Sequence, residues 1–359
     1  MLRQTKLATI TIGTAALLLA GVAAFNISVD ANNLLLDMHP WRGDEIGDYV
    51  AEMRSTPAGI RYSSQERRIK ARLAQTTKAD CYIIGSSQIM IANRDTLPYL
   101  ESHCTETVNL GVSGAALEDA GMFAGIVGAK ETTRLVLFGI DPWGFKLNQD
   151  RRWREVEPAF WQGREAIGLP RRDDLSGDPE TPAIFRLFTY AYLDRNWRVL
   201  RKEQEDAEEA AAQPAGAAGD PGDYMRFMPD GTLGYPQFLL NRDPMRPLED
   251  GGYRIEEPFT DAEAITEWKA IITWLRQRKI EVALLIPSYH PRVWDCQNQT
   301  ICDGLKAAEA AARSLAAEMG IKVIGGYDPR PFALTPADYI DERHLRPEIL
   351  RRLESPQNE

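Results

Sequence analysis

The stretch Cys81-Tyr82-Ile83-Ile84-Gly85-Ser86-Ser87 decides the fold, because a short apolar run meets a tight turn there. Four consecutive apolar residues bounded by glycine and serine predict a buried strand that ends at the turn. Two further short runs, 107–110 and 135–138, also stop at a glycine. The runs at 81–84 and 135–138 do not alternate in polarity. Strands that are apolar on both faces are typical of a parallel sheet covered by helices.

Strand and helix signals alternate along the rest of the chain. Helices are predicted near 65–75 and over 115–129, before the late helix that begins at a capping box of Thr260 and Glu263. A strand over 282–286, a helix over 303–319 closed by Gly320, and a strand over 322–324 follow. This repetition predicts an α/β fold with a doubly wound sheet.

The chain divides into segments of different composition. Residues 1–25 contain the one stretch that resembles a targeting signal, and 26–78 are polar, which indicates a stalk with a first helix. The α/β domain is expected over 79–355. It carries an insertion over 142–259, in which 202–222 is rich in Glu, Ala, Gly and Pro and is predicted to be flexible.

The first segment predicts export. Arg3 and Lys6 precede an uncharged run over 7–25, which as a helix is about 28 Å long and so close to the ~30 Å hydrocarbon core. Positive charge before the run predicts a single-pass signal anchor in the cytoplasmic (inner) membrane, with the C-terminal domain in the periplasm or another extracytoplasmic space. A cleaved signal peptide is the alternative, because Val22-Ala23-Ala24 suits a cleavage site. Both interpretations export the body of the protein.

Cysteine content agrees with an exported protein. Cys81, Cys104, Cys296 and Cys302 form an even set, which an oxidising compartment would pair. Of the three connectivities, we predict Cys81–Cys104, from neighbouring strands, and Cys296–Cys302, across a short polar loop. A metal site is not predicted, since the chain has no C-x-x-C or paired-histidine spacing.

The charge balance excludes one class of partner. Forty-two basic against 52 acidic residues give a net charge of -10. Nucleic-acid binding needs a cationic surface that replaces counterions, so no nucleic-acid partner is expected.

The chemistry-bearing residues cluster at predicted strand ends. In doubly wound sheets, ligands bind outside the carboxyl ends of the strands, and Ser87, Gly111, Gly114 and Asp141 all follow such ends. Near the C-terminus, Asp341 and His344 are three residues apart, a spacing that lets both side chains point the same way on one helical turn or tight loop. His290 follows a fourth strand and is a candidate for the substrate pocket.

This pattern resembles the SGNH/GDSL hydrolase superfamily, over about 79–141 and 260–350. The resemblance implies a flavodoxin-like sheet and a catalytic triad of Ser87, Asp341 and His344, with no cofactor. It also implies an oxyanion hole at Ser87 and at Gly111 or Gly114. The third-strand motif departs from the family, which has Asn where this chain has Asp141. An ionised Asp cannot donate a hydrogen bond as an amide does, and one missing donor can cost roughly 10²–10³ in rate.

The G-S-S turn, the predicted anchor and the D-x-x-H motif together resemble a narrower group. These are exported SGNH proteins such as the D-alanyl transfer protein of teichoic acid modification and the polysaccharide O-acetyltransferases. The resemblance implies an O-acyltransferase or esterase that acts on a cell-envelope or secreted glycan. It further implies a membrane-bound O-acyltransferase as partner.

Simpler interpretations of the same residues stay open. Ser87 could be a turn residue or a helix N-cap, and Asp341 could cap a helix that begins near Arg343. The missing Asn and the large insertion also fit a non-catalytic, SGNH-like assembly or binding protein of an envelope polysaccharide system, because fold alone does not establish function.

Overall fold

The computed structural model describes residues 2–29, 44–147, 152–170, 224–241, 260–295 and 299–355, together with most of 188–201. Contacts divide the chain into two compact units. One unit comprises 1–43 and 171–218, and the other comprises 44–170 and 219–359. The second unit carries the sheet and therefore takes in residues 44–78 with the predicted α/β domain. The predicted flexible segment 202–222 and Cys296 lie outside the described residues.

The first unit is built around α1 (Leu2–Val29), which covers the segment predicted to be helical. Its C-terminal end packs on the 188–201 segment, where the buried Asn196 donates from Nδ2 to Oδ1 of the buried Asn26 at 2.9 Å. Among the residues that the structure describes, no helix combines the length and the apolar character that crossing a membrane requires. The predicted transmembrane helix over 1–25 is therefore not supported, although the segment is helical.

The second unit contains a five-stranded sheet in which every pairing is parallel. Its strands are β2 (Cys81–Ile84), β3 (Thr107–Asn109), β4 (Leu135–Gly139), β7 (Glu281–Ile286) and β8 (Lys322–Gly325). They run in the order β3-β2-β4-β7-β8. With these five strands numbered along the chain, the order is 2-1-3-4-5, which is the flavodoxin-like order. The direction in which strands are added to the sheet reverses between β2 and β4. The predicted α/β fold with a parallel sheet is confirmed.

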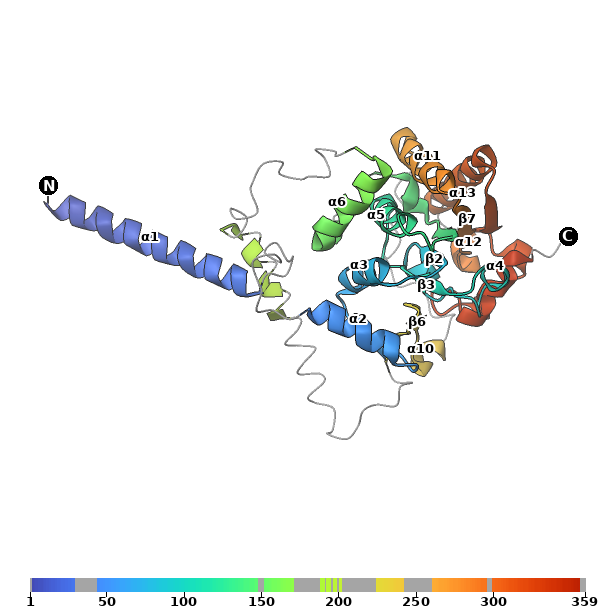
Figure 1. Cartoon of the computed structure of the whole chain (residues 1–359), viewed down its shortest axis with the longest axis horizontal. Helices are drawn as coiled ribbons and strands as arrows, with labels where there is room; N and C mark the ends of the chain where they lie inside the picture. The colour runs from blue at the N-terminus through green and yellow to red at the C-terminus, as the bar shows by residue number, and fades with distance from the viewer. Residues whose placement is uncertain are drawn as a thin grey trace. The chain divides into compact units, whose positions relative to one another are not determined.

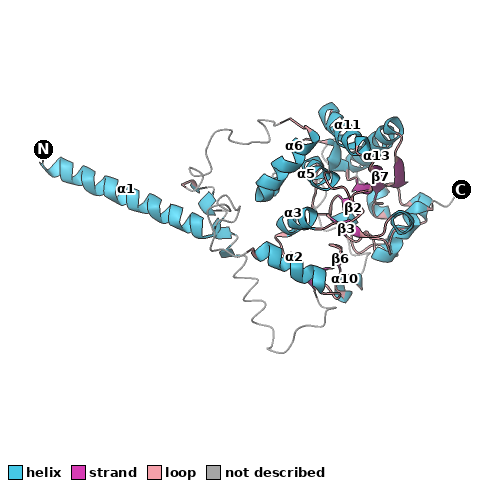
Figure 2. Cartoon of the chain, in the orientation of Figure 1, coloured by secondary structure: helices cyan, strands magenta, loops and turns pink. Residues whose placement is uncertain are grey.

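Helices cover both faces of this sheet, as the apolar strands predict (Figures 1 and 2). One face packs on α5 (Leu117–Gly128), α11 (Ala262–Gln277) and α13 (Gln299–Met319). Helices α3 (Glu66–Thr76) and α6 (Glu157–Ile167) pack against α5. An edge-on contact at 5.2 Å between Phe138 of β4 and Trp268 of α11 marks this layer. The other face packs on α4 (Pro98–His103) and on the 3₁₀ segments η5 (Arg330–Phe332) and η7 (Pro347–Glu354).

A second, smaller sheet is antiparallel and joins distant parts of the chain. β1 (Ile60–Arg61) pairs with β5 (Arg226–Phe227), which forms a hairpin with β6 (Leu233–Gly234). Helix α2 (Glu45–Ser55) packs on α3, and the short α10 (Gln237–Leu240) follows the hairpin. Of the insertion over 142–259, α6 and this hairpin belong to the same unit as the large sheet, whereas 171–218 belong to the first unit.

Local signals in the sequence fix several element ends. Gly320 has φ +62° directly after α13, the left-handed geometry expected of a glycine that ends a helix. Helix α11 is capped by Asp261, whose Oδ1 accepts the N–H of Glu263 at 3.0 Å. The predicted cap at Thr260 is therefore displaced by one residue. Asp261 also has a favourable carboxylate for the helix N-terminus.

The predicted Cys81–Cys104 disulfide is confirmed, with a Cα–Cα distance of 5.8 Å. It ties the start of β2 to the end of α4 within the apolar cluster on one face of the sheet. Cys302 is also disulfide-bonded. Its predicted partner, Cys296, lies outside the described residues.

Candidate active site

Three side chains predicted from distant parts of the sequence meet at one place. The Oγ of Ser87 lies 2.9 Å from Nε2 of His344, which is 257 residues further along the chain. The Nδ1 of His344 lies 2.9 and 2.8 Å from the two carboxylate oxygens of Asp341. With the proton on Nδ1, that nitrogen donates to Asp341 and Nε2 accepts the hydroxyl hydrogen of Ser87. The order hydroxyl, imidazole, carboxylate is the arrangement of a catalytic triad.

A tight loop presents Asp341 and His344 on the same side. Tyr339 and Leu345 pair as an isolated antiparallel bridge, and the Ile340 N–H donates to the His344 carbonyl at 2.8 Å. Inside this loop, Oδ1 of Asp341 accepts the N–H groups of Arg343 and His344, both at 2.9 Å. The structure has no helix at Arg343, since residues 341–343 form a bend. The Asp341 carboxylate thus shapes the loop and orients the imidazole at once.

Asp341 is ionised at neutral pH. Burial raises the pKa of its carboxyl, but the hydrogen bonds and charge of His344 and the two backbone N–H groups outweigh burial and lower the pKa to about 2. A carboxylate that stays charged can hold the imidazole tautomer and stabilise the imidazolium form.

The turn after β2 exposes one serine and buries the other. Ser86 is fully buried and its Oγ accepts the Gln88 N–H at 3.2 Å, capping the 3₁₀ segment η2 (Ser87–Ile89). Ser87 is partly exposed, whereas every other residue of 81–90 is buried. Gly85 makes the turn feasible, because a Cβ there would lie 2.9 Å from the Gly139 carbonyl oxygen of the neighbouring strand. Ser87 is therefore the serine that a substrate can reach.

Of the two glycines predicted for the oxyanion hole, Gly114 suits the role better. The Gly111 N–H already donates to Oδ1 of Asn109 at 2.8 Å, and Gly111 is buried. Gly114 is partly exposed, with φ +57°, a conformation that suits glycine. Within the described residues, the N–H groups of Gly114 and Ser87 have no hydrogen-bond acceptor. Backbone donors of this kind can bind a developing oxyanion.

A buried polar network holds the loop that carries Gly114, and the sequence did not reveal it. Glu66 of α3 accepts the Ser113 N–H at 2.7 Å. Arg67 donates to both oxygens of Asp119 at 3.1 Å and to the Ser113 carbonyl oxygen at 3.1 Å. Asp119 in turn accepts the Ala116 N–H at the start of α5. Charged residues in a predicted helix ordinarily indicate a solvent face, so no local signal distinguishes Glu66 and Arg67 as buried.

Asp141 is buried beside the turn that carries Ser87, at 4% exposure. Its Oδ1 accepts a 2.6 Å hydrogen bond from Nε2 of Gln88, which also lies 3.1 Å from the Tyr289 hydroxyl. Burial raises the pKa of Asp141 to about 7, although hydrogen bonds from Ser86 and Gln88 and the nearby positive charge of Arg343 lower it. Gln88 is a further residue that sequence reasoning missed, since its only signal is its place next to Ser87.

His290, predicted for the substrate pocket, lies next to the loop of the triad. It is buried at 3% exposure, its N–H donates to the Glu342 carbonyl oxygen at 3.2 Å, and its ring meets Tyr339 edge-on at 5.1 Å. Its Nδ1 accepts the Arg292 N–H at the start of α12 (Pro291–Trp294). The contacts give His290 a part in supporting the Asp341–His344 loop.

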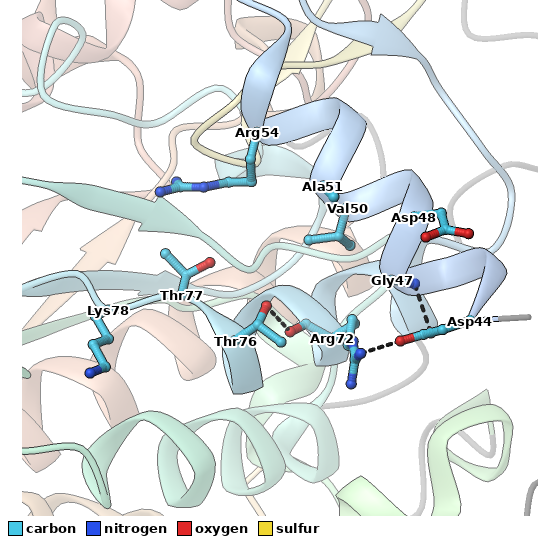
Figure 3. Close-up of a pocket in the computed structure, with 10 residues that line it drawn as sticks. All are labelled: Asp44, Gly47, Asp48, Val50, Ala51, Arg54, Arg72, Thr76, Thr77 and Lys78. Carbon is cyan, nitrogen blue, oxygen red and sulfur yellow. Dashed lines mark hydrogen bonds and ion pairs between the residues drawn. The ribbon is translucent and has the colours of Figure 1, made fainter.

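A cavity of about 670 Å³ lies elsewhere in the unit, between α2, α3 and the segment that leads into β2 (Figure 3). Arg72 donates a hydrogen bond to the carboxylate of Asp44 across the cavity, and Thr77 and Lys78 line its far side. Because Thr77 and Lys78 precede β2 and Ser87 follows it, the cavity is at the amino end of that strand. It is therefore separate from the triad.

The fold and the site together define a class: an α/β protein with a flavodoxin-like strand order that carries a Ser–His–Asp constellation at the carboxyl edge of its sheet. That edge at the reversal of strand order is where such sheets bind their ligands. No protein-family model matches the chain, and no curated protein matches it either.

Proposed function

We propose that the protein is an SGNH-type acyl-transfer enzyme that uses Ser87 as nucleophile, His344 as base and Asp341 as the orienting carboxylate. The observation that carries the proposal is the 2.9 Å approach of Ser87 Oγ to His344 Nε2, with Asp341 on the opposite nitrogen. A serine hydroxyl is a poor nucleophile until a base takes its proton. Supporting evidence also comes from the exposure of Ser87 within an otherwise buried turn.

The proposed reaction has two halves. The Ser87 oxygen adds to the acyl carbonyl carbon, its proton passes to His344 Nε2, and the carbonyl electron pair moves to the oxyanion, which the N–H groups of Ser87 and Gly114 bind. The proton on His344 then leaves with the alcohol of the donor ester, so that an acyl-serine forms. Water or a sugar hydroxyl attacks in the second half, giving an esterase or a transferase.

The acceptor and the location follow from the resemblance and from the disulfide. We propose an acyl group carried to or from a hydroxyl of a cell-envelope or secreted glycan, with a membrane-bound O-acyltransferase as donor partner. The Cys81–Cys104 disulfide supports an extracytoplasmic location, because such bonds persist in oxidising compartments.

The test is covalent labelling and turnover. Wild-type protein should release a burst of nitrophenol from p-nitrophenyl acetate and should react with a fluorophosphonate probe at Ser87. Ser87→Ala should abolish labelling and lower turnover by roughly 10⁴-fold or more. Ser102→Ala, a matched change in α4 away from the site, should behave as wild type. Labelling of Ser87→Ala equal to that of wild type would rule the proposal out.

The histidine supplies a second matched pair. His344→Ala should lose the burst, whereas His103→Ala, in the exposed last turn of α4, should keep it. A transferase is distinguished from an esterase by adding an oligosaccharide acceptor and measuring its mass: acyl transfer to the acceptor at the expense of hydrolysis identifies a transferase. If neither Ser87→Ala nor His344→Ala changes the phenotype of a deletion strain complemented with the gene, the non-catalytic assembly function is favoured instead.

A further inference from the structure

Asp141 and Ser87 are counterpart positions on neighbouring strands. In the parallel pairing of β2 and β4, Ile84 is opposite Phe138. Ser87 and Asp141 each follow their paired residue by three positions. The two strand ends also approach closely, because a Cβ on Gly139 would lie 2.6 Å from a side-chain carbon of Ile89 in the nucleophile turn. Asp141 therefore stands beside the nucleophile, at the place where the family resemblance predicts an amide donor.

The groups around Asp141 come from four elements. Ser86 and Gln88 face it from the nucleophile turn, and Arg343 and His344 from the loop of the triad. Tyr289, after β7, and Tyr327, after β8, complete the surroundings as buried phenols whose pKa values are raised, above all by burial. Phenols of this kind stay neutral, so the positive charges that act on Asp141 are those of Arg343 and, when it is protonated, His344.

The hydrogen-bond inventory of this cluster lacks a donor. Gln88 uses its Nε2 to reach Asp141 and Tyr289, while its Oε1 is buried and has no partner among the described residues. A buried acceptor without a donor is costly. An ionised Asp141 carboxylate would add only acceptors to a cluster that already holds this unpaired acceptor, so protonation of the carboxyl reduces the imbalance. Since Oδ1 already accepts from Gln88, the proton belongs on Oδ2.

We propose that Asp141 acts as a neutral carboxylic acid and donates a hydrogen bond to the oxyanion, in place of the amide that the family resemblance predicts. The inference rests on the proposed acyl transfer at Ser87. The proton stays on Asp141 throughout: the serine proton moves to His344, and the Asp141 O–H only shares its hydrogen with the oxyanion as the carbonyl electron pair shifts. A carboxylic acid that is kept neutral by its apolar site can serve as such a donor.

The burial of Asp141 fits this role. Burial raises the pKa of its carboxyl to about 7, so the neutral form is abundant below neutral pH and is lost above it. Activity that depends on the neutral form must therefore fall on the alkaline side. An amide at the same position does not titrate and would donate at every pH.

Two substitutions separate a donor from a merely structural residue. Asp141→Asn should stay within about tenfold of the wild-type kcat/KM at pH 6 and should lack the alkaline decline that wild type shows up to pH 9. Asp141→Ala, which cannot donate, should lose about 10²–10³-fold at pH 6. Asp95→Asn, an exposed control, should leave the whole pH profile as in wild type. The proposal would be overturned if kcat/KM of Asp141→Asn declined at the same alkaline pH as that of wild type. Equal losses of kcat/KM in Asp141→Asn and Asp141→Ala at pH 6 would overturn it as well.

A second readout does not depend on activity. The folded protein keeps a proton on Asp141 that the unfolded chain has already lost, so the stability of wild type relative to Asp141→Asn should fall as pH rises from about 4 to about 7. Thermal unfolding measures this difference in Tm. A constant difference across the range would show that Asp141 is already ionised and would overturn the inference. Wild-type turnover in Ser87→Ala, by contrast, would refute the proposed acyl transfer and leave this titration measurable.

Discussion

The ion pair of Arg67 and Asp119 offers a sharp test of how the site is held. Arg67 is 2% exposed and Asp119 is 1% exposed, so both charges lie in the protein interior. Two N–H···O bonds at 3.1 Å join them, and a third reaches the Ser113 carbonyl oxygen. Arg67→Met keeps most of the aliphatic volume and removes all three bonds. It leaves the carboxylate of Asp119 buried without its cationic partner.

The expected cost is set by that uncompensated charge. Breaking a buried pair by removing one partner costs about 3–5 kcal/mol, and we expect about 4 kcal/mol here because, among the described residues, Asp119 keeps only the hydrogen bond from the Ala116 N–H. At about 2–4 °C per kcal/mol for a domain of this size, Tm should fall by roughly 8–16 °C. The loop that carries Gly114 also loses its anchor, so kcat should fall even in protein that remains folded.

Urea unfolding followed by tryptophan fluorescence measures the change, since the chain has eight tryptophans. The double variant Arg67→Met/Asp119→Asn removes both charges and should recover about 2 kcal/mol relative to the sum of the single changes. Arg330→Met breaks a surface pair with Asp328, where the arginine side chain is 72% exposed, and should cost less than about 1 kcal/mol. If Arg67→Met costs no more than Arg330→Met, the interior pair does not support the loop and the reasoning fails.

Three further outcomes follow from the site and its disulfide. Asp341→Asn should lower kcat/KM by about 10⁴-fold, because the imidazole of His344 loses the partner that fixes its tautomer, and a loss below tenfold would exclude a triad. The pKa of Asp341, about 2 when folded, means that its carboxylate stabilises the fold above pH 4 and that this stability is lost as pH falls toward 2. At 29% side-chain exposure we expect about 1–2 kcal/mol, so wild type and Asp341→Asn should differ by that amount at pH 7 and converge near pH 2 in thermal unfolding; a constant gap would contradict it. Replacing Cys81 and Cys104 by alanine removes a disulfide between residues with a sequence separation of 23 and should lower the free energy of unfolding by about 3 kcal/mol. An equal free energy of unfolding in oxidised and reduced wild-type protein would contradict this prediction.

The sequence predicted what depends on short stretches of chain. The apolar runs at 81–84, 135–138 and 282–286 identified strands β2, β4 and β7, because a parallel strand that is buried on both faces is a continuous run of apolar residues. Gly320 and the D-x-x-H spacing were also readable, since a left-handed glycine and a loop of four residues are local features. The cap of α11 was missed by one residue because Thr260 and Asp261 are both good caps.

Residues that act through distant contacts could not be predicted in this way. Lys70 is fully buried and donates to the Asn109 carbonyl oxygen, 39 residues away, and to that of Gly231, 161 residues away. Burial lowers the pKa of its ammonium to about 7, yet nothing in the helix sequence separates it from the half-buried Arg72 on the same helix. The choice between Gly111 and Gly114 likewise required the Asn109 side chain, which occupies the Gly111 N–H. Hydrogen-bond partners of this range are a property of the fold.

The strand order explains why the predicted residues meet at all. The direction in which successive strands are added to the sheet reverses between β2 and β4, so the loops after these two parallel strands diverge to opposite faces and leave a crevice at the carboxyl edge. Ser87 and Asp141 follow these two strands at matching positions, which puts a hydroxyl and a buried carboxyl side by side. The loop of Asp341 and His344 comes after β8 at the end of the domain, where the Tyr339–Leu345 bridge and the His290 N–H hold it over the same edge. A Ser–His contact across 257 residues thus depends on the strand order, which brings the two ends of the domain to one edge of the sheet.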